Sequence, residues 1–139
     1  MPAKNVYHDA VVAALKADGW TITADPHRVS IGRRRLFVDL AGERAPVTAD
    51  RGGERIAVEV QSFLRNSDIE DFHHAIGQYA VYRAILRSTD PGRELYLAVP
   101  DEVYTGIFSE PIGHLVVADL GMKVVVFHPT ERRITQWIS

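Results

Sequence analysis

The sequence contains no cysteine, and this absence excludes both a disulfide framework and thiolate chemistry. A chain without disulfides suits the reducing interior of a cell, so we expect a cytoplasmic protein. The sequence also lacks any apolar run near the roughly 20 residues that a membrane span needs. Its first residues do not form the apolar core of a signal peptide. We therefore expect no membrane association.

A large excess of positive charge is missing as well. The 16 Lys and Arg residues are outnumbered by 18 Asp and Glu residues, which gives a net charge of −2 at pH 7. This balance argues against a protein that coats nucleic acid electrostatically, although it permits a local basic patch. Such a patch is present at Arg28 and Arg33–Arg35. We interpret Arg33, Arg34 and Arg35 either as DNA-binding residues that hold phosphate or as the solvated start of a strand.

Internal repeats and low-complexity segments are also absent. The chain has 139 residues, of which 46% are hydrophobic, and this is enough apolar material for one buried core. We therefore predict a single domain over residues 1–139. The pattern of apolar residues predicts an α/β fold with a core of one helix, three strands, a helix and a strand, followed by C-terminal helices and strands.

Turn and capping signals place these elements along the chain. Ser67 and Glu70 form a capping box, so the helix that follows is expected to run to about Arg87. A strand, a helix and a strand in succession predict that the second strand lies parallel to the first. A polar loop is expected over residues 41–46. The expected helices cover residues 3–18, 67–87, 101–108 and 112–119, and the expected strands cover residues 20–23, 34–40, 47–50, 56–61, 94–99, 123–127 and 134–138.

The strand around Glu59 is the centre of the predicted site. Alternation places Glu59 and Gln61 on one face of this strand and the apolar residues Ile56, Val58 and Val60 on the other. A carboxylate within an apolar strand is costly to desolvate unless it has a partner, a metal or access to water. Glu59 and Gln61 are roughly 6.6 Å apart along the strand, so both can touch one reactant. The simpler alternative is that Glu59 faces solvent.

Asp39, on the strand expected over residues 34–40, offers a second carboxylate. Two carboxylates on neighbouring strands favour a hard cation such as Mg²⁺ over zinc. The hairpin expected between residues 47–50 and the Glu59 strand puts Pro46 opposite Glu59, so Asp39 needs a bulge or a bend to approach. The alternative is that Asp39 is an ordinary residue at the end of a strand.

The order of the elements, with Asp39 and the segment Glu59-Val60-Gln61, resembles the restriction-endonuclease-like fold and its PD-(D/E)xK signature. Over nearly its whole length the chain resembles the XisH family, the fdxN element excision controlling factors of cyanobacteria and related bacteria. The resemblance implies a mixed sheet flanked by helices. It also implies a bacterial protein that acts with an XisI-like partner in DNA recombination. The segments that carry the XisH resemblance are residues 2–4, 18–23, 57–63, 77–78, 93–100 and 110–113.

The nuclease resemblance implies roles for individual residues. Asp39 and Glu59 would hold Mg²⁺ with help from the backbone carbonyl of Val60. Gln61 stands where the signature has lysine, and an amide can orient a water molecule but carries no positive charge and is no base. Gln61 therefore departs from the catalytic pattern.

Three further residues are candidates for auxiliary roles. Gln78 and Tyr82 lie at i and i+4 on one predicted helix and resemble the Gln-x-x-x-Tyr element of RecB-like nucleases. In the simpler interpretation, Tyr82 is a core residue. His8, on the first predicted helix, either reaches the site or lies on the surface.

Two classes of function follow. The favoured class is a regulatory subunit that controls excision of a DNA element on a nuclease-like scaffold, and the alternative is an active Mg²⁺-dependent DNA endonuclease. Apolar residues in the C-terminal third either complete the core or form a surface for a homodimer or for the XisI-like partner. These residues are Ile107, Phe108, Ile112, Leu115, Val116, Trp137 and Ile138.

Overall fold

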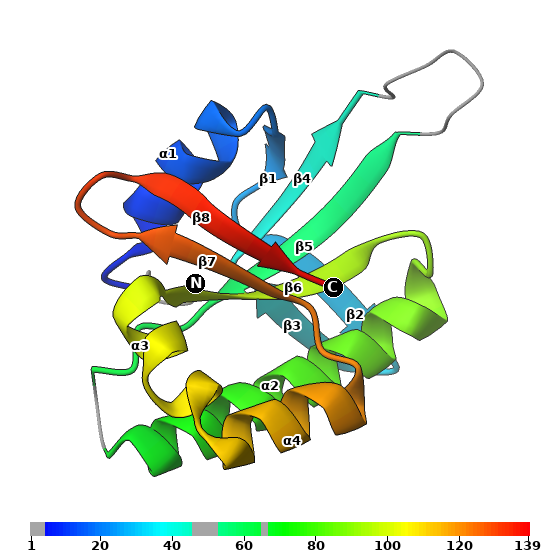
Figure 1. Ribbon diagram of the computed structural model, residues 1–139. Helices are drawn as coiled ribbons and strands as arrows, with labels where there is room; N and C mark the ends of the chain where they lie inside the picture. The colour runs from blue at the N-terminus through cyan, green and yellow to red at the C-terminus, as the bar shows by residue number, and fades with distance from the viewer. Residues whose placement is uncertain (1–4, 46–52, 65–66) are drawn as a thin grey trace.

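A six-stranded mixed β-sheet and a separate two-stranded hairpin organise the computed structural model, which describes residues 5–45, 53–64 and 67–139 (Figure 1). The helices are α1 (His8–Ala17), α2 (Asp68–Thr89), α3 (Asp101–Thr105), the short 3₁₀ helix η1 (Ile107–Ser109) and α4 (Pro111–Leu120). The strands are β1 (Thr21–Ala24), β2 (His27–Ile31), β3 (Arg34–Val38), β4 (Leu40–Arg44), β5 (Glu54–Val60), β6 (Glu94–Pro100), β7 (Val124–His128) and β8 (Arg133–Ile138).

The order of strands in the large sheet is β1-β4-β5-β6-β7-β8. The central strands β5, β6 and β7 are parallel, and the strands outside them are antiparallel. The predicted α/β class is confirmed, because a mixed sheet is flanked by helices in a restriction-endonuclease-like arrangement. The predicted parallel pairing of β5 with β6 across α2 is confirmed too.

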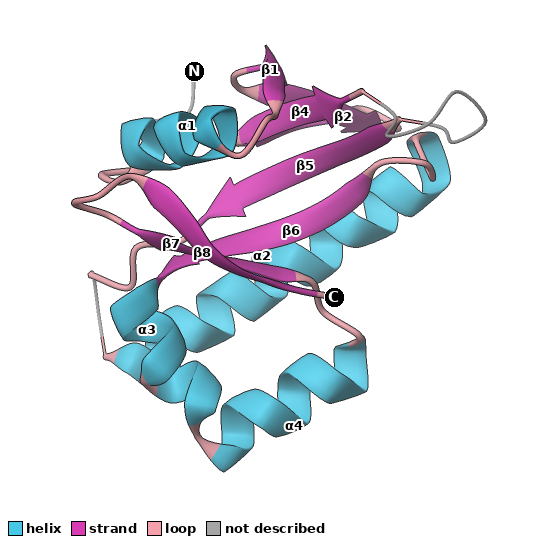
Figure 2. Cartoon of the chain, turned by 45° about the horizontal axis from the view of Figure 1, so that its top comes forward, coloured by secondary structure: helices cyan, strands magenta, loops and turns pink. Residues whose placement is uncertain are grey.

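The two faces of the sheet carry two separate hydrophobic clusters. Ile56, Val58 and Val60 of β5 face α1, where Val11 and Leu15 are buried against them. The alternate face packs against α2 and the β2–β3 hairpin (Figure 2). Because β5, β6 and β7 are buried on both faces, nearly every apolar side chain on them is removed from water. Full burial stabilises the fold by about 1.5–3 kcal/mol for each large apolar side chain.

Helix α2 begins at the predicted capping residue. The Ser67 Oγ accepts a hydrogen bond from the Glu70 amide at 3.3 Å, which satisfies one of the free N–H groups at the helix start. Tyr79, buried in the middle of the helix, donates its hydroxyl proton to the Leu95 carbonyl at 3.3 Å and accepts from the Lys123 amide at 3.0 Å. These bonds fix the helix to β6 and to the start of β7.

The region before β5 differs from the prediction. The strand expected over residues 34–40 is divided at Asp39, because β3 pairs with β2 in the hairpin while β4 joins the large sheet. The loop expected over residues 41–46 is wrong for 41–44, which form most of β4. The strand at 27–31 was not predicted. The strand expected over residues 47–50 lies outside the described residues.

Other boundaries differ at the ends of the chain. Helix α1 starts at His8, and residues 5–7 are not helical. Of the C-terminal apolar residues, Ile107 and Phe108 are buried in the core, whereas Ile112 and Leu115 are 39% and 69% exposed. Trp137 packs edge-on against Tyr96, with ring centroids 5.0 Å apart. None of the helices in the described ranges is long and apolar enough to cross a membrane.

Two helical glycines make a matched test of this packing. A Cβ at Gly113 would collide with the Ile107 carbonyl oxygen and come within 2.6 Å of the Phe108 Cα, whereas a Cβ at Gly77 would meet nothing within 4 Å. Gly113→Ala is therefore expected to lower the free energy of unfolding by about 1–3 kcal/mol. Gly77→Ala should raise it by up to about 1 kcal/mol through helix propensity. Urea unfolding measures both, and equal effects would contradict the packing described for α4.

Candidate functional site

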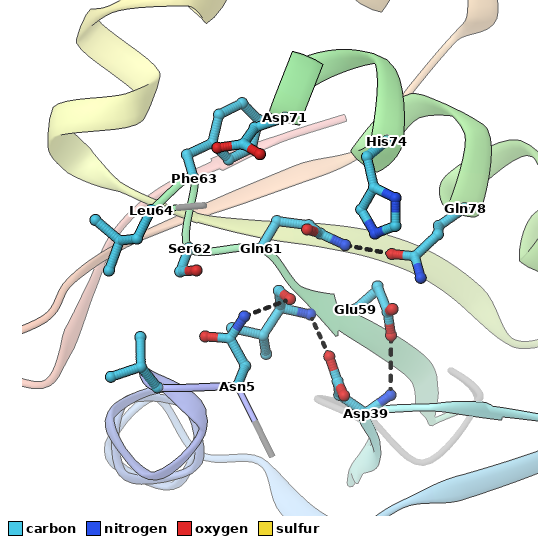
Figure 3. A pocket seen from close by; sticks show the side chains of 12 residues that line it. Asn5, Asp39, Glu59, Gln61, Ser62, Phe63, Leu64, Asp71, His74 and Gln78 are labelled. Atoms are coloured by element: carbon cyan, nitrogen blue, oxygen red, sulfur yellow. Dashed lines mark hydrogen bonds between the residues drawn. The ribbon is translucent and has the colours of Figure 1, made fainter. Parts of the chain in front are cut away.

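A cleft of about 460 Å³ opens beyond the C-terminal end of β5. Side chains from the segment before α1, from the β3–β4 junction, from β5 and the residues after it, and from α2 meet there (Figure 3). The cleft therefore brings together residues that are far apart in the sequence. The lining residues are Asn5, Val6, Asp39, Glu59, Val60, Gln61, Ser62, Phe63, Leu64, Asp71, His74 and Gln78.

Asp39 and Glu59 hold each other through reciprocal hydrogen bonds. The Asp39 amide donates to Glu59 Oε1 at 3.1 Å, and the Val60 amide donates to Asp39 Oδ2 at 2.8 Å. The cause is the register of β4 on β5, which pairs Leu40 with Val58 and so places the preceding residue beside Glu59. The expectation that Asp39 needs a bulge or a bend to approach Glu59 is therefore wrong, while Pro46, which was expected opposite Glu59, lies outside the described residues.

The carboxyl pair is poorly solvated, because Glu59 is buried and Asp39 is half-buried at the cleft. Only 5% of Glu59 is exposed, and burial, followed by the charge of Asp39, raises the pKa of Glu59 to about 9. Burial also raises the pKa of Asp39. Two adjacent carboxylates in a poorly solvated site cannot both ionise cheaply. We therefore expect the pair to share one proton at neutral pH, and the raised pKa of Glu59 favours its carboxyl group as the site of that proton. Glu59 is thus not the solvent-facing residue of the simpler alternative.

The donor atoms of this pair are compatible with Mg²⁺. Mg²⁺ is commonly held by one or two carboxylates together with water and substrate phosphate, and Asp39 and Glu59 are such a set once the shared proton leaves. The Val60 carbonyl oxygen accepts a hydrogen bond from Asn5 Nδ2 at 3.2 Å and has a second lone pair. Within the described residues, no group of three or more His, Asp or Glu is placed to hold a metal.

Gln61 is held by α2. Its Nε2 donates a short hydrogen bond to the Gln78 Oε1, and both amides lie at the cleft near Glu59 (Figure 3). The position that has lysine in the PD-(D/E)xK signature is therefore occupied by an uncharged amide, one of whose two N–H donors is engaged by Gln78. Gln61 can position a ligand or a water, but it cannot offset negative charge that develops in a reaction.

The other residues predicted for the site, which are Tyr82, His8 and the three arginines, do not line the cleft. Burial, followed by the charges of Glu59 and Asp39, raises the pKa of Tyr82. His8 is 3% exposed, which contradicts the surface alternative, and its Nε2 lies 2.7 Å from Asp25 Oδ1. Neither residue lines the cleft. The side chains of Arg33, Arg34 and Arg35 are exposed on the β2–β3 hairpin and do not line it either.

Comparisons with known proteins agree with this architecture. A family model described as XisH protein matches residues 1–135. An XisH family protein of solved structure from Nostoc punctiforme PCC 73102 is 41% identical with a TM-score of 0.88, over 97% of this chain and 100% of that one. The structure of a fdxN element excision controlling factor protein from Anabaena variabilis is 39% identical with a TM-score of 0.86, over 98% of this chain and 100% of that one. Curated proteins gave no match.

The chain belongs to the XisH family. The family model and both solved structures cover nearly all of it, so the predicted resemblance to XisH proteins is confirmed. The names of these relatives describe XisH proteins and an excision controlling factor. For this XisH chain, whether the cleft binds or cuts DNA is therefore argued from its own residues.

The XisH cleft contains residues that the sequence analysis did not assign. His74 lies one helical turn before Gln78, and helical periodicity alone places residues 74, 78 and 82 on one face. Asn5 has no comparable signal, because its Oδ1 accepts from the Tyr7 amide at 2.9 Å in a turn that only the structure reveals. Asp71, 7% exposed, completes the α2 side of the cleft.

The shared proton predicts how the stability of this XisH protein depends on pH. The folded pKa of Glu59 is about 9 against an ordinary value of 4.5, so the folded state binds more protons than the unfolded state between these values. The free energy of unfolding should therefore be highest below the ordinary pKa and fall as the pH rises from about 5 to about 9. Glu59→Gln should flatten this dependence in urea unfolding measured across that range.

The matched control is Glu54→Gln, because Glu54 lies on the same strand but is exposed and paired with Arg44. This variant should retain the pH dependence of the wild type. An unchanged slope in Glu59→Gln would show that Glu59 is ionised in the folded protein.

Proposed function

We propose that this XisH-family protein controls the excision of a DNA element by binding DNA along the β2–β3 hairpin and the cleft, together with an XisI-like partner. The relative from Anabaena variabilis is named as a fdxN element excision controlling factor, and the identity of 39% over 98% of the chain supports a shared role. A role on chromosomal DNA places the protein in the bacterial cytoplasm.

The observation that carries the DNA-binding role is the charge of the hairpin. Residues 26–38 contain four arginines and no Asp or Glu, although the whole chain has a net charge of −2. Arg33, Arg34 and Arg35 are exposed at and after the turn. Arginine suits phosphate recognition because its planar donors match phosphate oxygens. Strand β3 runs from these arginines to the residue before Asp39, so in this proposal DNA lies along the hairpin and extends to the cleft.

The chemistry of the cleft supports binding over cutting. A proton on Glu59 weakens its affinity for a cation at neutral pH, because Mg²⁺ has to displace that proton. Gln61 supplies no positive charge where the nuclease signature has lysine. Both features describe a site that can hold DNA and regulate its processing without efficient hydrolysis.

The partner surface in this proposal is the outer face of α4. Ile112 and Leu115 expose large apolar side chains there, while the helix packs on the core through Val116, Val117 and Leu120. Exposed apolar groups on one helix suit a protein interface. We assign this face to the XisI-like partner, or to a second copy of the chain in a homodimer.

Salt dependence of DNA binding tests the hairpin. We expect replacement of Arg33, Arg34 and Arg35 by alanine to weaken the binding of a labelled duplex. It should also reduce the slope of log K against log salt by up to about 0.9 for each lost phosphate contact. Fluorescence anisotropy at several salt concentrations measures both quantities. The control is Arg132→Ala, at the exposed β7–β8 turn, and an equal loss in that variant would argue against the hairpin.

A second candidate function, a Mg²⁺-dependent DNA endonuclease, is favoured by the Asp39–Glu59 pair itself. The two carboxyls meet at the open end of a cleft beside the Val60 carbonyl, as the PD-(D/E)xK assignment requires. Asp39 and Glu59 would hold the ion with the Val60 carbonyl. Mg²⁺ bound there would polarise a phosphoryl oxygen and acidify a bound water. Gln61 would orient that water.

Gln61→Lys tests this second candidate. If the site lacks only its usual cation, Gln61→Lys should raise Mg²⁺-dependent nicking of plasmid DNA above the wild-type rate, because lysine restores the missing charge. Adding Glu59→Ala to Gln61→Lys should abolish the gain, and calorimetry should show that Glu59→Ala loses Mg²⁺ binding while Glu54→Ala keeps it. No nicking by either the wild type or Gln61→Lys would remove the endonuclease and leave the regulatory role.

A further inference from the structure

Gly77 lies in the middle of α2, where neither a positive φ nor a close contact with the described residues requires a glycine. Glycine in a helix interior is less favourable than alanine by up to about fivefold in an equilibrium constant. At Gly113 the backbones of Ile107 and Phe108 explain the absence of a side chain. At Gly77, which is exposed, a Cβ would meet nothing within 4 Å. The surface of α2 is therefore open at this position, and the described residues do not account for the glycine.

Gly77 forms the floor of a groove between α2 and β3. The groove has a volume of about 360 Å³ and is lined by Leu36, His73, His74, Gly77, Gln78, Val81 and Tyr82. His74 and Gln78 also line the carboxylate cleft, so the groove adjoins the cleft along the surface of α2. A ligand that crosses the cleft therefore has a path over Gly77.

The lining of the groove suits a flat, uncharged ring. Leu36 and Val81 are apolar, and Val81 is 51% exposed. The imidazoles of His73 and His74 and the phenol of Tyr82 offer planar surfaces on which a nucleobase can stack. Among the residues that the structure describes, no Asp or Glu lines this groove, in contrast to the cleft.

The surface beside the groove carries an arginine that suits the phosphate of a nucleotide whose base lies in the groove. Arg34 shares a face of β3 with Leu36, because residues two apart in a strand point the same way. The basic hairpin therefore lies at the outer end of the groove, while the carboxyl pair lies at its inner end. A nucleic acid strand can place a base over Gly77 and keep its backbone on the arginine side.

We propose that the groove over Gly77 holds one unpaired base of the DNA strand that crosses the cleft. The substrate class is thus DNA with an unpaired nucleotide beside the site, such as a single strand, a frayed end or a flipped base. This inference rests on the DNA-binding function proposed above. The open space at Gly77 and the adjacency of groove and cleft carry it.

Filling the groove tests the proposal. Gly77→Leu places a side chain where the structure has open space, so the variant should fold and melt at or above the wild-type temperature. Its affinity for a single-stranded oligonucleotide should fall at least about tenfold, the size expected for one lost stacked base. Its affinity for continuous duplex should change little. Ala80→Leu, exposed on the same helix outside the groove, is the matched control and should bind like the wild type.

Base stacking can be observed directly. An oligonucleotide with 2-aminopurine at the unpaired position should lose fluorescence on binding the wild type and Ala80→Leu, but not Gly77→Leu. A second variant, Val81→Glu, puts a carboxylate at the edge of the groove and should weaken single-strand binding in the same way. Ala80→Glu is its control for charge.

The outcomes separate this proposal from the function on which it rests. If the wild type binds neither duplex nor single strands, the DNA-binding function fails and the groove assignment fails with it. If the wild type binds duplex, but Gly77→Leu and Val81→Glu leave single-strand affinity and 2-aminopurine fluorescence unchanged, only the groove proposal is overturned. If Gly77→Leu leaves DNA binding intact but changes the mass measured by light scattering, the groove is a protein interface and the proposal is also overturned.

Discussion

The burial of two adjacent carboxyl groups is the constraint on which the site depends. The pairing of β4 with β5 in one register brings Asp39 beside Glu59. In this register the Glu59 carboxyl accepts a hydrogen bond from the Asp39 amide, and the Asp39 carboxyl accepts one from the Val60 amide. A shift by one residue would turn these side chains to the opposite face. The shared proton and the position of both carboxyls at the cleft therefore follow from the pairing of β4 with β5.

Several elements of the described chain surround this pair. Helix α1 covers one face of β5, while α2 and the hairpin cover the other. Asn5 binds the Val60 carbonyl, and Gln78 binds Gln61, so the segment after β5 is held between the N-terminal segment and α2. What remains open is a path from the carboxyl pair over α2. In our proposal DNA follows this path and the basic hairpin holds its phosphates.

Part of this arrangement could be predicted from the sequence. The Ser67 cap, the long helix and the two apolar strands around it have strong local signals, and strand alternation was sufficient to put Glu59 and Gln61 on one face. Gln78 was a candidate only through its resemblance to the Gln-x-x-x-Tyr element. Strand β4 was missed because its sequence, with Gly42 between Ala41 and Glu43, looks like a loop. In the structure Gly42 lies against Trp20 and the Thr21 carbonyl, and pairing across some 20 residues of sequence leaves no local signal. The proton on Glu59 follows from that pairing and could not be predicted without it.

The most direct test of the account is the protonation state of Glu59. Carbon-13 NMR of protein labelled at the glutamate side-chain carboxyls, with Glu59→Gln to assign the resonance, reports protonation at each residue. The account predicts one glutamate resonance that remains at its protonated position at pH 7 and titrates near the pKa of about 9. A Glu59 resonance that titrates near the ordinary value of 4.5 would contradict the shared proton and the description of the site built on it.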